Sequence, residues 1–222
     1  MRPQIFLATL VLLAAAPAPH FPAPTRPVSP IVSPSWSDED TRVAANEATT
    51  VLRLVGVRPG MSVADVGAGE GFYTVRLARS VGPQGRVFAE DVVPTYTKAL
   101  TRRLADENLH NVSVTLGALD DARLPPSSID RALLIHMYHE IAQPYALMWR
   151  LHASLKPGGV VAIVDANRGT GNHGTPPKLL ACEMAAVGYR ETSFTPDIGA
   201  GGYLALFVPV VRPEVAAIKP CR

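Results

Sequence analysis

Apolar and polar positions along this chain follow a strand-like pattern in some stretches and a helix-like pattern in others, and the two kinds of stretch alternate. Short apolar runs rich in valine and isoleucine suit strands buried on both faces, and they alternate with longer amphipathic stretches that predict helices. We expect strands at 62–66, 86–90, 112–116, 129–135 and 160–165. We expect helices at 37–55, 72–80, 95–107 and 144–154. Such alternation predicts a parallel sheet with helices on both faces and right-handed crossovers.

The last part of the chain breaks this alternation. A predicted helix at 177–187 is followed by two apolar stretches, 189–195 and 203–210, which are separated only by the glycine-rich segment 196–202. A link this short joins antiparallel strands, so one of the two strands runs against the rest. The sequence therefore predicts an α/β, Rossmann-like doubly wound sheet of about seven strands, mostly parallel, with a C-terminal antiparallel hairpin strand.

Both ends of the chain differ in composition from the alternating part. After Arg2, the apolar stretch within 1–16 matches a signal peptide or an N-terminal anchor and is short for a bilayer span. Residues 17–34 contain seven prolines and little hydrophobic periodicity, which predicts an extended, semi-rigid linker outside the packed fold. The folded domain is expected at 35–211, followed by a C-terminal tail at 212–222.

Charge and cysteine content narrow the function classes. The 222 residues carry a formal net charge of +2 without any run rich in lysine or arginine, so no nucleic-acid partner is indicated. The cysteines, Cys182 and Cys221, lack the Cys-x-x-Cys spacing of a zinc site, and we expect no metal ion in the protein. Cys182 lies in an apolar helix pattern and is expected to be buried, whereas a disulfide between the two stays an open alternative in an oxidising compartment.

The most informative motif lies between the first expected strand and the helix after it. Its residues are Asp65-Val66-Gly67-Ala68-Gly69-Glu70-Gly71. Glycines in such a turn let the backbone approach a nucleotide-like ligand closely. The dinucleotide fingerprint Gly-x-Gly-x-x-Gly would need its third glycine at Phe72 or Thr74, so an NAD-dependent oxidoreductase is disfavoured. Asp65 also repels a pyrophosphate and suits a cationic amino group.

The Asp-x-Gly-x-Gly-x-Gly spacing resembles motif I of the class I S-adenosylmethionine-dependent methyltransferases. Segment 60–94 and the later Tyr138-His139-Glu140 look like the bacterial methyltransferases related to the UbiE-type group, and the turn at 156–159 resembles the one before their fifth strand. The resemblance covers 38–210 and implies this fold, S-adenosylmethionine as cofactor and a small-molecule methyl acceptor. It also implies cofactor contacts along the loop, at Asp65, Gly67, Ala68, Gly69 and Gly71.

Two further acids are candidates for cofactor contacts. The second strand ends in Glu90-Asp91, and the family pattern favours Asp91 as the acceptor for both ribose hydroxyls, with Glu90 as the alternative. An acid at such a strand end also serves as a helix cap, which is the structural alternative. Relatives place an acid or amide after the glycine that follows the third strand, whereas this chain has Ala118 there. Asp120 is then expected to contact the adenine, unless it only stabilises a turn.

The end of the fourth strand is expected to carry the acceptor chemistry. His139 or His136 is the candidate general base, since an imidazole with its ordinary pKa near 6.5 accepts protons at neutral pH. His136 is also a candidate contact for the methionine end of the cofactor, and Tyr138 is expected to form a pocket wall. After the fifth strand, Asp165, Asn167 and Arg168 are candidates to read the acceptor, and 169–174 has the composition of a mobile lid.

These motifs together predict a methyltransferase that acts on a small-molecule acceptor. The alternative from another class is an exported binding module that keeps the fold but has lost catalysis. The N-terminal pattern predicts a periplasmic or membrane-anchored protein, or a cytoplasmic one if that segment is no export signal. Membrane attachment is expected only through the N-terminus, and nothing in the sequence predicts the oligomeric state.

Overall fold

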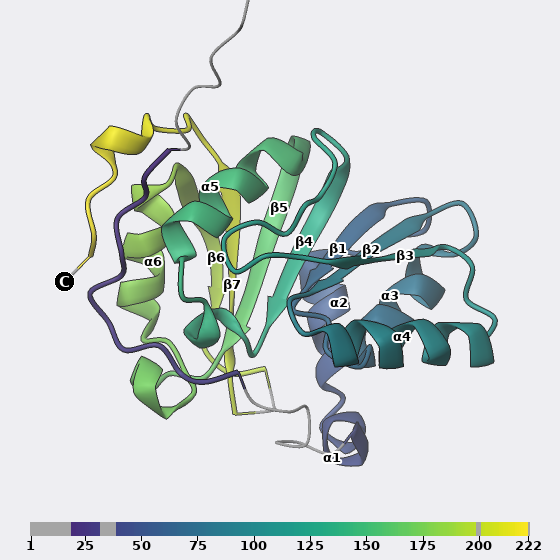
Figure 1. The fold of residues 1–222 in the computed structure, drawn as a ribbon. Helices are drawn as coiled ribbons and strands as arrows, with labels where there is room; N and C mark the ends of the chain where they lie inside the picture. Colours follow the sequence, from purple (N-terminus) through teal and green to yellow (C-terminus); the bar gives the residue numbers. More distant parts are fainter. Residues whose placement is uncertain (1–18, 32–38, 199–200, 222) are drawn as a thin grey trace, which may run out of the picture.

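One sheet of seven strands organises the molecule. The computed structural model describes residues 19–31, 39–198 and 201–221, and within these ranges the strand order is β3-β2-β1-β4-β5-β7-β6. The strands are β1 (Ser62–Val66), β2 (Arg86–Asp91), β3 (Val112–Leu116), β4 (Ile129–Ile135), β5 (Leu155–Asp165), β6 (Tyr189–Thr195) and β7 (Tyr203–Pro209). Figure 1 shows them as one twisted layer with helices on both faces.

Six α-helices and three short 3-10 turns complete the described part of the chain. The helices are α1 (Glu39–Ala44), α2 (Glu47–Val55), α3 (Phe72–Val81), α4 (Pro94–Asp106), α5 (Pro144–Ser154) and α6 (Pro177–Ala186). The turns are η2 (Tyr138–Glu140), η3 (Thr170–Asn172) and η4 (Val215–Ala217). None of the described helices is long and apolar enough to cross a membrane.

The strand directions confirm the predicted topology. Strands β1 to β5 pair in parallel, whereas β7 runs antiparallel to β5 and to β6. The chain leaves β1 toward β2 and β3 and then returns to β4 on the other side of β1, so the connections reverse direction beside β1. In sheets of this kind, ligands bind at the carboxyl ends of the strands next to this reversal.

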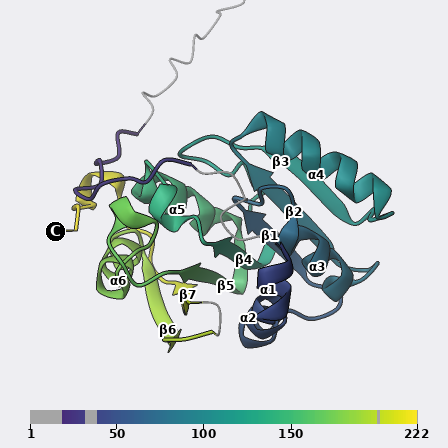
Figure 2. The ribbon, with the colours of Figure 1, turned by 90° about the horizontal axis from the view of Figure 1, so that it is seen from below.

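Two packed layers bury the sheet. On one face, Val63 and Val87 contact α2 and α3, and Ala89 contacts Leu100 of α4. On the other face, Val66 and Ile163 pack with residues of α5 and α6. Successive residues of a strand point to opposite faces, so the valines and isoleucines of each run serve both layers. Figure 2 shows the two groups of helices on opposite sides of the sheet.

Two predicted elements differ from the structure in their bounds. The helix expected at 37–55 is broken into α1 and α2, because Asn46 adopts a left-handed conformation with φ 52° that a helix cannot continue through; the expected cap Ser37 lies outside the described residues. The turn predicted at 156–159 lies within β5, where it interrupts the pairing: Ile129 pairs with Leu155, and the next pair joins Arg131 to Val160.

The prediction that 17–34 is a linker outside the packed fold is wrong for residues 19–31. We call these residues the N-terminal strap; it is purple in Figure 1 and runs alongside α6. Phe21 joins the core and packs edge-on against Trp149, and Nε of Arg26 donates a hydrogen bond of 2.9 Å to Glu183 of α6. Prolines keep the strap extended, and the side chains of Phe21 and Arg26 between them are buried against the domain. The predicted signal or anchor at 1–16 and residues 32–34 lie outside the described residues.

The C-terminal tail also packs onto the domain. Cys221 forms a disulfide with Cys182 of α6, the pairing that the sequence left open. Cys182 is also exposed, so the prediction that it is a buried apolar residue is wrong. The indole of Trp149 donates a 2.8 Å hydrogen bond to the Pro213 carbonyl. The tail and the strap therefore cover the same side of the sheet, over α5 and α6.

Candidate active site

A cavity of about 770 Å³ opens where β1, β2 and β4 end. Val66, Asp91 and Ile135, the last residues of these strands, all contribute to its wall. This volume falls within the range of roughly 300–1,000 Å³ that is usual for small-molecule sites. The cavity thus lies at the position that the strand topology predicts for a ligand.

The glycine loop after β1 forms one wall through its backbone. Gly67, Ala68 and Gly69 line the cavity, and both glycines have positive φ, 72° and 54°. A Cβ on Gly67 would lie 2.9 Å from Cγ of Met137, so no larger residue fits there without displacing that side chain. Gly71 does not line the cavity; it begins α3, where a Cβ would lie 2.4 Å from Leu100.

Asp65 lies beneath this loop and does not contribute to the cavity wall. Its Oδ2 accepts a 2.6 Å hydrogen bond from the Thr74 hydroxyl, which ties β1 to the first turn of α3. Burial raises the pKa of Asp65 to about 6, although the Thr74 hydrogen bond works in the opposite direction. The structure therefore gives Asp65 a positioning role in the loop, and its interaction with a cationic amino group, through the loop backbone or an ordered water, stays a prediction.

Asp91 and Glu90 both line the cavity from the end of β2. Asp91 accepts 2.8 Å hydrogen bonds from the backbone N–H groups of Gly69 and Val93, so its carboxylate is fixed beside the glycine loop. Burial and the neighbouring charge of Asp91 raise the pKa of Glu90 to about 8. Oε1 of Glu90 has no hydrogen-bond partner among the described residues. A Cβ on Gly117 would overlap this oxygen, which explains the glycine after β3.

Asp120 does not reach the cavity. Its carboxylate and its backbone carbonyl both accept hydrogen bonds from Arg150 of α5, and only its neighbours Ala118 and Leu119 line the wall. The predicted adenine contact is therefore not provided by Asp120. The wall at this point is apolar, which suits the face of a planar ring.

A buried carboxylate that the sequence did not reveal lies on the opposite side of the loop. Glu47 of α2 accepts hydrogen bonds from Arg42, at 2.7 Å, and from the Tyr73 hydroxyl, at 2.9 Å. Its Oε2 lies 3.1 Å from Nε2 of His136, which adopts a left-handed conformation with φ 54°. Burial would raise the pKa of Glu47, but the His136 and Arg42 contacts outweigh it and lower the pKa to about 2. Nothing in the helix pattern distinguished Glu47 from a surface residue.

His139 is held by a buried carboxylate. Its Nδ1 lies 2.9 Å from Oδ1 of Asp165, which is fully buried and also accepts hydrogen bonds from Thr175 and the Ala166 backbone. Its Nε2 lies 3.9 Å from Oε1 of Glu140, and both residues line the cavity. The predicted pocket wall at Tyr138 is wrong: its ring is fully buried on the other side of η2, below the Arg26 guanidinium.

The segment after β5 is a packed turn. Arg168 and His173 line the cavity, whereas Asn167 contributes only to a separate, smaller hollow and Asp165 acts from behind His139. Thr170 is buried and its carbonyl accepts a hydrogen bond from Ser29 of the strap. This contact anchors η3, so the predicted mobile lid is replaced by a turn that holds His173 in place.

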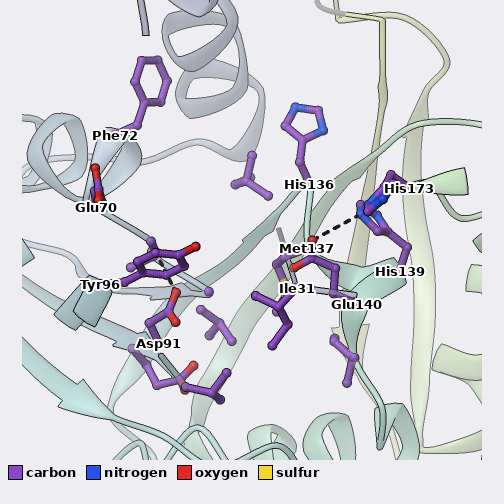
Figure 3. Close-up of a pocket in the computed structure, with 18 of the residues that line it drawn as sticks. Ile31, Glu70, Phe72, Asp91, Tyr96, His136, Met137, His139, Glu140 and His173 are labelled. Carbon is purple, nitrogen blue, oxygen red and sulfur yellow. Dashed lines mark hydrogen bonds and ion pairs between the residues drawn. The ribbon is translucent and has the colours of Figure 1, made fainter. Parts of the chain in front are cut away.

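The cavity therefore has two halves, which Figure 3 shows facing each other. The glycine-loop half comprises Gly67–Gly69, Glu70, Phe72, Asp91 and Tyr96. The histidine half comprises His139, Glu140, Arg168, His173 and Ile31 of the strap. His136 and Met137 lie between the halves, at the end of β4.

The fold and this cavity define the class I methyltransferase architecture, and comparisons with known proteins agree. Residues 63–159 match the family model described as a methyltransferase domain. The chain is 26% identical over 120 residues to a demethylmenaquinone methyltransferase of Geobacillus stearothermophilus, covering 54% of this chain and 51% of that protein. The chain thus spans about half the length of the curated relatives it matches.

Solved structures show the same fold. A SAM-dependent methyltransferase from Aquifex aeolicus superposes with a TM-score of 0.70 at 22% identity, covering 79% of this chain and 100% of that one. Phosphoethanolamine N-methyltransferase 1 from Haemonchus contortus, in complex with phosphoethanolamine and S-adenosylhomocysteine, gives 0.62 at 13% identity, covering 80% and 46%. The chain therefore contains a region that matches a methyltransferase domain, and its described part has the fold of the class I S-adenosylmethionine-dependent methyltransferase family.

The residues of the glycine-loop half fit the cofactor of this family. A carboxylate fixed beside the loop, at Asp91, suits two ribose hydroxyls, and a glycine cradle that a Cβ would fill at Gly67 suits close approach of a ligand to the backbone. The apolar wall at Ala118 and Leu119 suits the adenine.

Proposed function

We propose that this protein transfers a methyl group from S-adenosylmethionine to a small-molecule acceptor. The observation that carries the proposal is the division of one cavity into a glycine-loop half, which fits the cofactor, and a histidine half, which fits an acceptor. The glycine-loop motif and the strand order support the first assignment. The second rests on the position of His139 opposite the loop.

In the glycine-loop half, fixed groups orient the cofactor. The Asp91 carboxylate accepts hydrogen bonds from the ribose hydroxyls, and the backbone of Gly67 to Gly69 lies against the methionine portion. Glu47, ionised because its pKa is lowered to about 2, supplies negative charge to the cavity wall near His136. Arg42, which also lines the cavity, pairs with this carboxylate and offsets its charge.

In the histidine half, His139 is the better candidate for the general base. S-adenosylmethionine supplies an activated methyl group on a sulfonium, so the protein mainly positions the acceptor and removes a proton where the acceptor carries one. Asp165 holds the His139 ring by Nδ1, which leaves Nε2 for the acceptor. Nε2 of His136 is already bonded to Glu47, so we assign His136 to the wall between the halves.

The lining of the cavity favours an acceptor with an apolar body and a polar reacting group. Ile31, Met137, Ile141 and Leu147 supply apolar surface, and polar side chains are added by His139, Glu140, Arg168 and His173. The relatives named for demethylmenaquinone act, by that name, on an apolar acceptor. Their name supports an apolar acceptor here without identifying it.

We also propose that the protein functions outside the cytoplasm. The disulfide between Cys182 and Cys221 supports this, because disulfides persist in oxidising compartments, and the predicted signal or anchor at 1–16 points the same way. Cell fractionation with an antibody against the chain tests it: recovery in the periplasm or membrane is expected. Recovery only from the cytoplasm, with both thiols reduced, would contradict the proposal.

Calorimetric titration of the purified protein with S-adenosylmethionine and S-adenosylhomocysteine tests the main proposal. We expect one site per chain with a dissociation constant in the micromolar range or tighter. Absence of binding by both ligands at millimolar concentration would contradict it. A protein recovered from the periplasm that binds neither would instead support an exported binding module.

A further inference from the structure

Three potential metal ligands meet in the histidine half of the cavity. His139, Glu140 and His173 each offer one ligand atom, and these atoms all lie within 4.8 Å of one another. His139 and Glu140 lie in η2 after β4, and His173 directly follows η3 after β5. Figure 3 shows the two rings and the carboxylate converging on one corner of the cavity, away from the glycine loop.

The His139 ring is oriented as metal-binding histidines are. An ionised Asp165 can only accept, so Nδ1 of a neutral His139 carries the proton of their 2.9 Å hydrogen bond and Nε2 carries the lone pair. This carboxylate–imidazole arrangement fixes the tautomer and the direction of the ligand atom. Nε2 then faces Oε1 of Glu140 at 3.9 Å, which is too long for a hydrogen bond. These two acceptor atoms thus lie at a separation that one cation bound to both would bridge.

One serine of the strap ties the two histidine backbones together. The backbone N–H of Ser29 donates a 3.1 Å hydrogen bond to the His139 carbonyl, and the Ser29 hydroxyl accepts a 3.2 Å hydrogen bond from the His173 backbone N–H. The same hydroxyl donates to the Thr170 carbonyl, and Ser29 is only 2% exposed. The two rings also meet edge to face, with centroids 5.4 Å apart. The strap therefore fixes the spacing of the two imidazoles.

We propose that His139, Glu140 and His173 bind a divalent transition-metal ion, for which Zn²⁺ is the reference. Two imidazoles and one carboxylate form a donor set that Zn²⁺ accepts, and three protein ligands leave a fourth position open. Ligand atoms in a tetrahedral zinc site lie about 3.3 Å apart, so side-chain rotations that bring these atoms closer by up to about 1.5 Å complete the site. This proposal differs from the expectation of no metal ion, which was based on the cysteine spacing.

The open position faces the cavity. With the ion bound, Nε2 of His139 is a ligand and is no longer available as the general base. If the proposed methyl transfer is correct, the ion would instead bind the reacting oxygen, nitrogen or sulfur of the acceptor, lower the pKa of its proton so that the proton leaves to solvent, and hold the acceptor opposite the glycine-loop half; this role rests on the proposed function. Metal binding itself does not depend on it. The competing explanation is a metal-free pair between a protonated His139 and Glu140, which needs no contribution from His173.

The test uses the purified protein, stripped with EDTA and returned to metal-free buffer at pH 7.5. Zn²⁺ is titrated by calorimetry, and Co²⁺ by its visible absorption, whose intensity distinguishes four-coordinate from six-coordinate sites. We expect one ion per chain with a micromolar or tighter dissociation constant and an intense Co²⁺ spectrum. Failure of both ions to bind at 100-fold excess over protein would overturn the proposal.

Four variants assign the site. Affinity is expected to fall at least about 100-fold in His173→Ala and Glu140→Gln, which remove a ligand, and about 10-fold in Ser29→Ala, which removes its support. His110→Ala, at an exposed histidine of the loop before β3, should keep full affinity. Equal affinity in His173→Ala and the wild type would overturn the assignment. Glu140→Gln, the conservative change, keeps the test decisive if His173→Ala folds poorly, and S-adenosylhomocysteine binding in EDTA separates loss of the ion site from loss of the cofactor site.

Discussion

The two halves of the cavity are built in different ways. The glycine-loop half, apart from Tyr96 of α4, comes from one continuous βαβ unit, in which β1, the loop, α3 and β2 follow each other between Ser62 and Asp91. The histidine half is assembled from the strap, η2 and η3, whose residues Ser29, His139 and His173 are far apart in the sequence. Local backbone geometry shapes the first half, whereas long-range polar contacts shape the second.

The two halves are therefore expected to respond differently to substitution. The glycine-loop half depends on residues that must stay small or stay acidic, and a change there acts directly on ligand binding. The histidine half depends on buried contacts made by the strap, and a change in the strap acts through the stability of the fold. Substitutions that separate binding from stability therefore test the comparison.

The largest effect on stability is expected for Arg26→Ala. Arg26 and Glu183 form an ion pair whose side chains are 4% and 1% exposed, so removal of the arginine leaves a buried, uncompensated carboxylate. The free energy of unfolding should fall by about 3–5 kcal/mol, measured by urea denaturation. The matched control is Arg79→Ala, which breaks an exposed pair with Glu107 and should cost less than about 1 kcal/mol. Equal losses in the two variants would show that the strap does not hold the histidine half.

The next effect is expected on ligand affinity, in Gly69→Val. Gly69 has φ 54° and lines the cavity, so a β-branched side chain is strained there and occupies the space of the ligand. Affinity for S-adenosylhomocysteine should fall at least about 100-fold, equivalent to about 2.7 kcal/mol. Gly158→Val provides the control, since Gly158 has φ 77° and open space around it but lies in β5, where the pairing is interrupted. If both variants bind normally, the loop does not approach the cofactor.

A smaller loss is expected in Asp91→Asn. The amide keeps the shape but loses the charge of the carboxylate that is fixed by Gly69, and charge-assisted hydrogen bonds to the ribose contribute about 1.5–3 kcal/mol. Calorimetry should show S-adenosylhomocysteine binding about 10–100-fold weaker. Asp120→Asn is the control, because Asp120 pairs with Arg150 outside the cavity and should bind within about twofold of the wild type. A larger loss of affinity in Asp120→Asn than in Asp91→Asn would support the adenine contact that the sequence predicted for Asp120.

The smallest effect is a pH dependence of stability that comes from Glu90. Its pKa is raised from 4.5 to about 8 in the folded protein, so the folded state keeps a proton that the unfolded chain loses above pH 4.5. The stabilisation is therefore complete below pH 4.5 and is lost as the pH rises toward 8. We expect the free energy of unfolding to fall by about 1 kcal/mol per pH unit between pH 5 and 7. In Glu90→Gln the slope between pH 6 and 7 should be lost, whereas Asp65, whose pKa is raised to about 6, keeps part of the slope below pH 6. An unchanged slope in the variant would assign the dependence to another group.

The sequence was sufficient to predict most of the fold and the glycine-loop half. Apolar runs of strand length, the turns between them and the short link before β7 carry local signals, and Asp91 follows its strand at a recognisable position. The break at Asn46 was missed because asparagine adopts the left-handed conformation in some contexts and helix in others. Asp120 was misassigned because the sequence does not show that Arg150 lies beside it.

The histidine half was only partly predictable. His139 was identified from its motif, but its orientation depends on Asp165, one strand further along, and the position of His173 depends on Ser29 in the strap. The proline content of the strap indicated a linker, since composition reports backbone stiffness and not burial. Tyr138 was predicted to form a pocket wall because the fourth strand delivers its segment to the rim of the site, whereas η2 turns the Tyr138 ring into the core.

A crystal structure of the protein with S-adenosylhomocysteine tests the central claim most directly, because it shows which half the ligand occupies. The account predicts the adenosine over the glycine loop, both ribose hydroxyls within hydrogen-bond distance of Asp91, and the sulfur directed toward His139. The same ligand bound outside this cavity, or in the histidine half with its sulfur directed away from His139, would contradict the account.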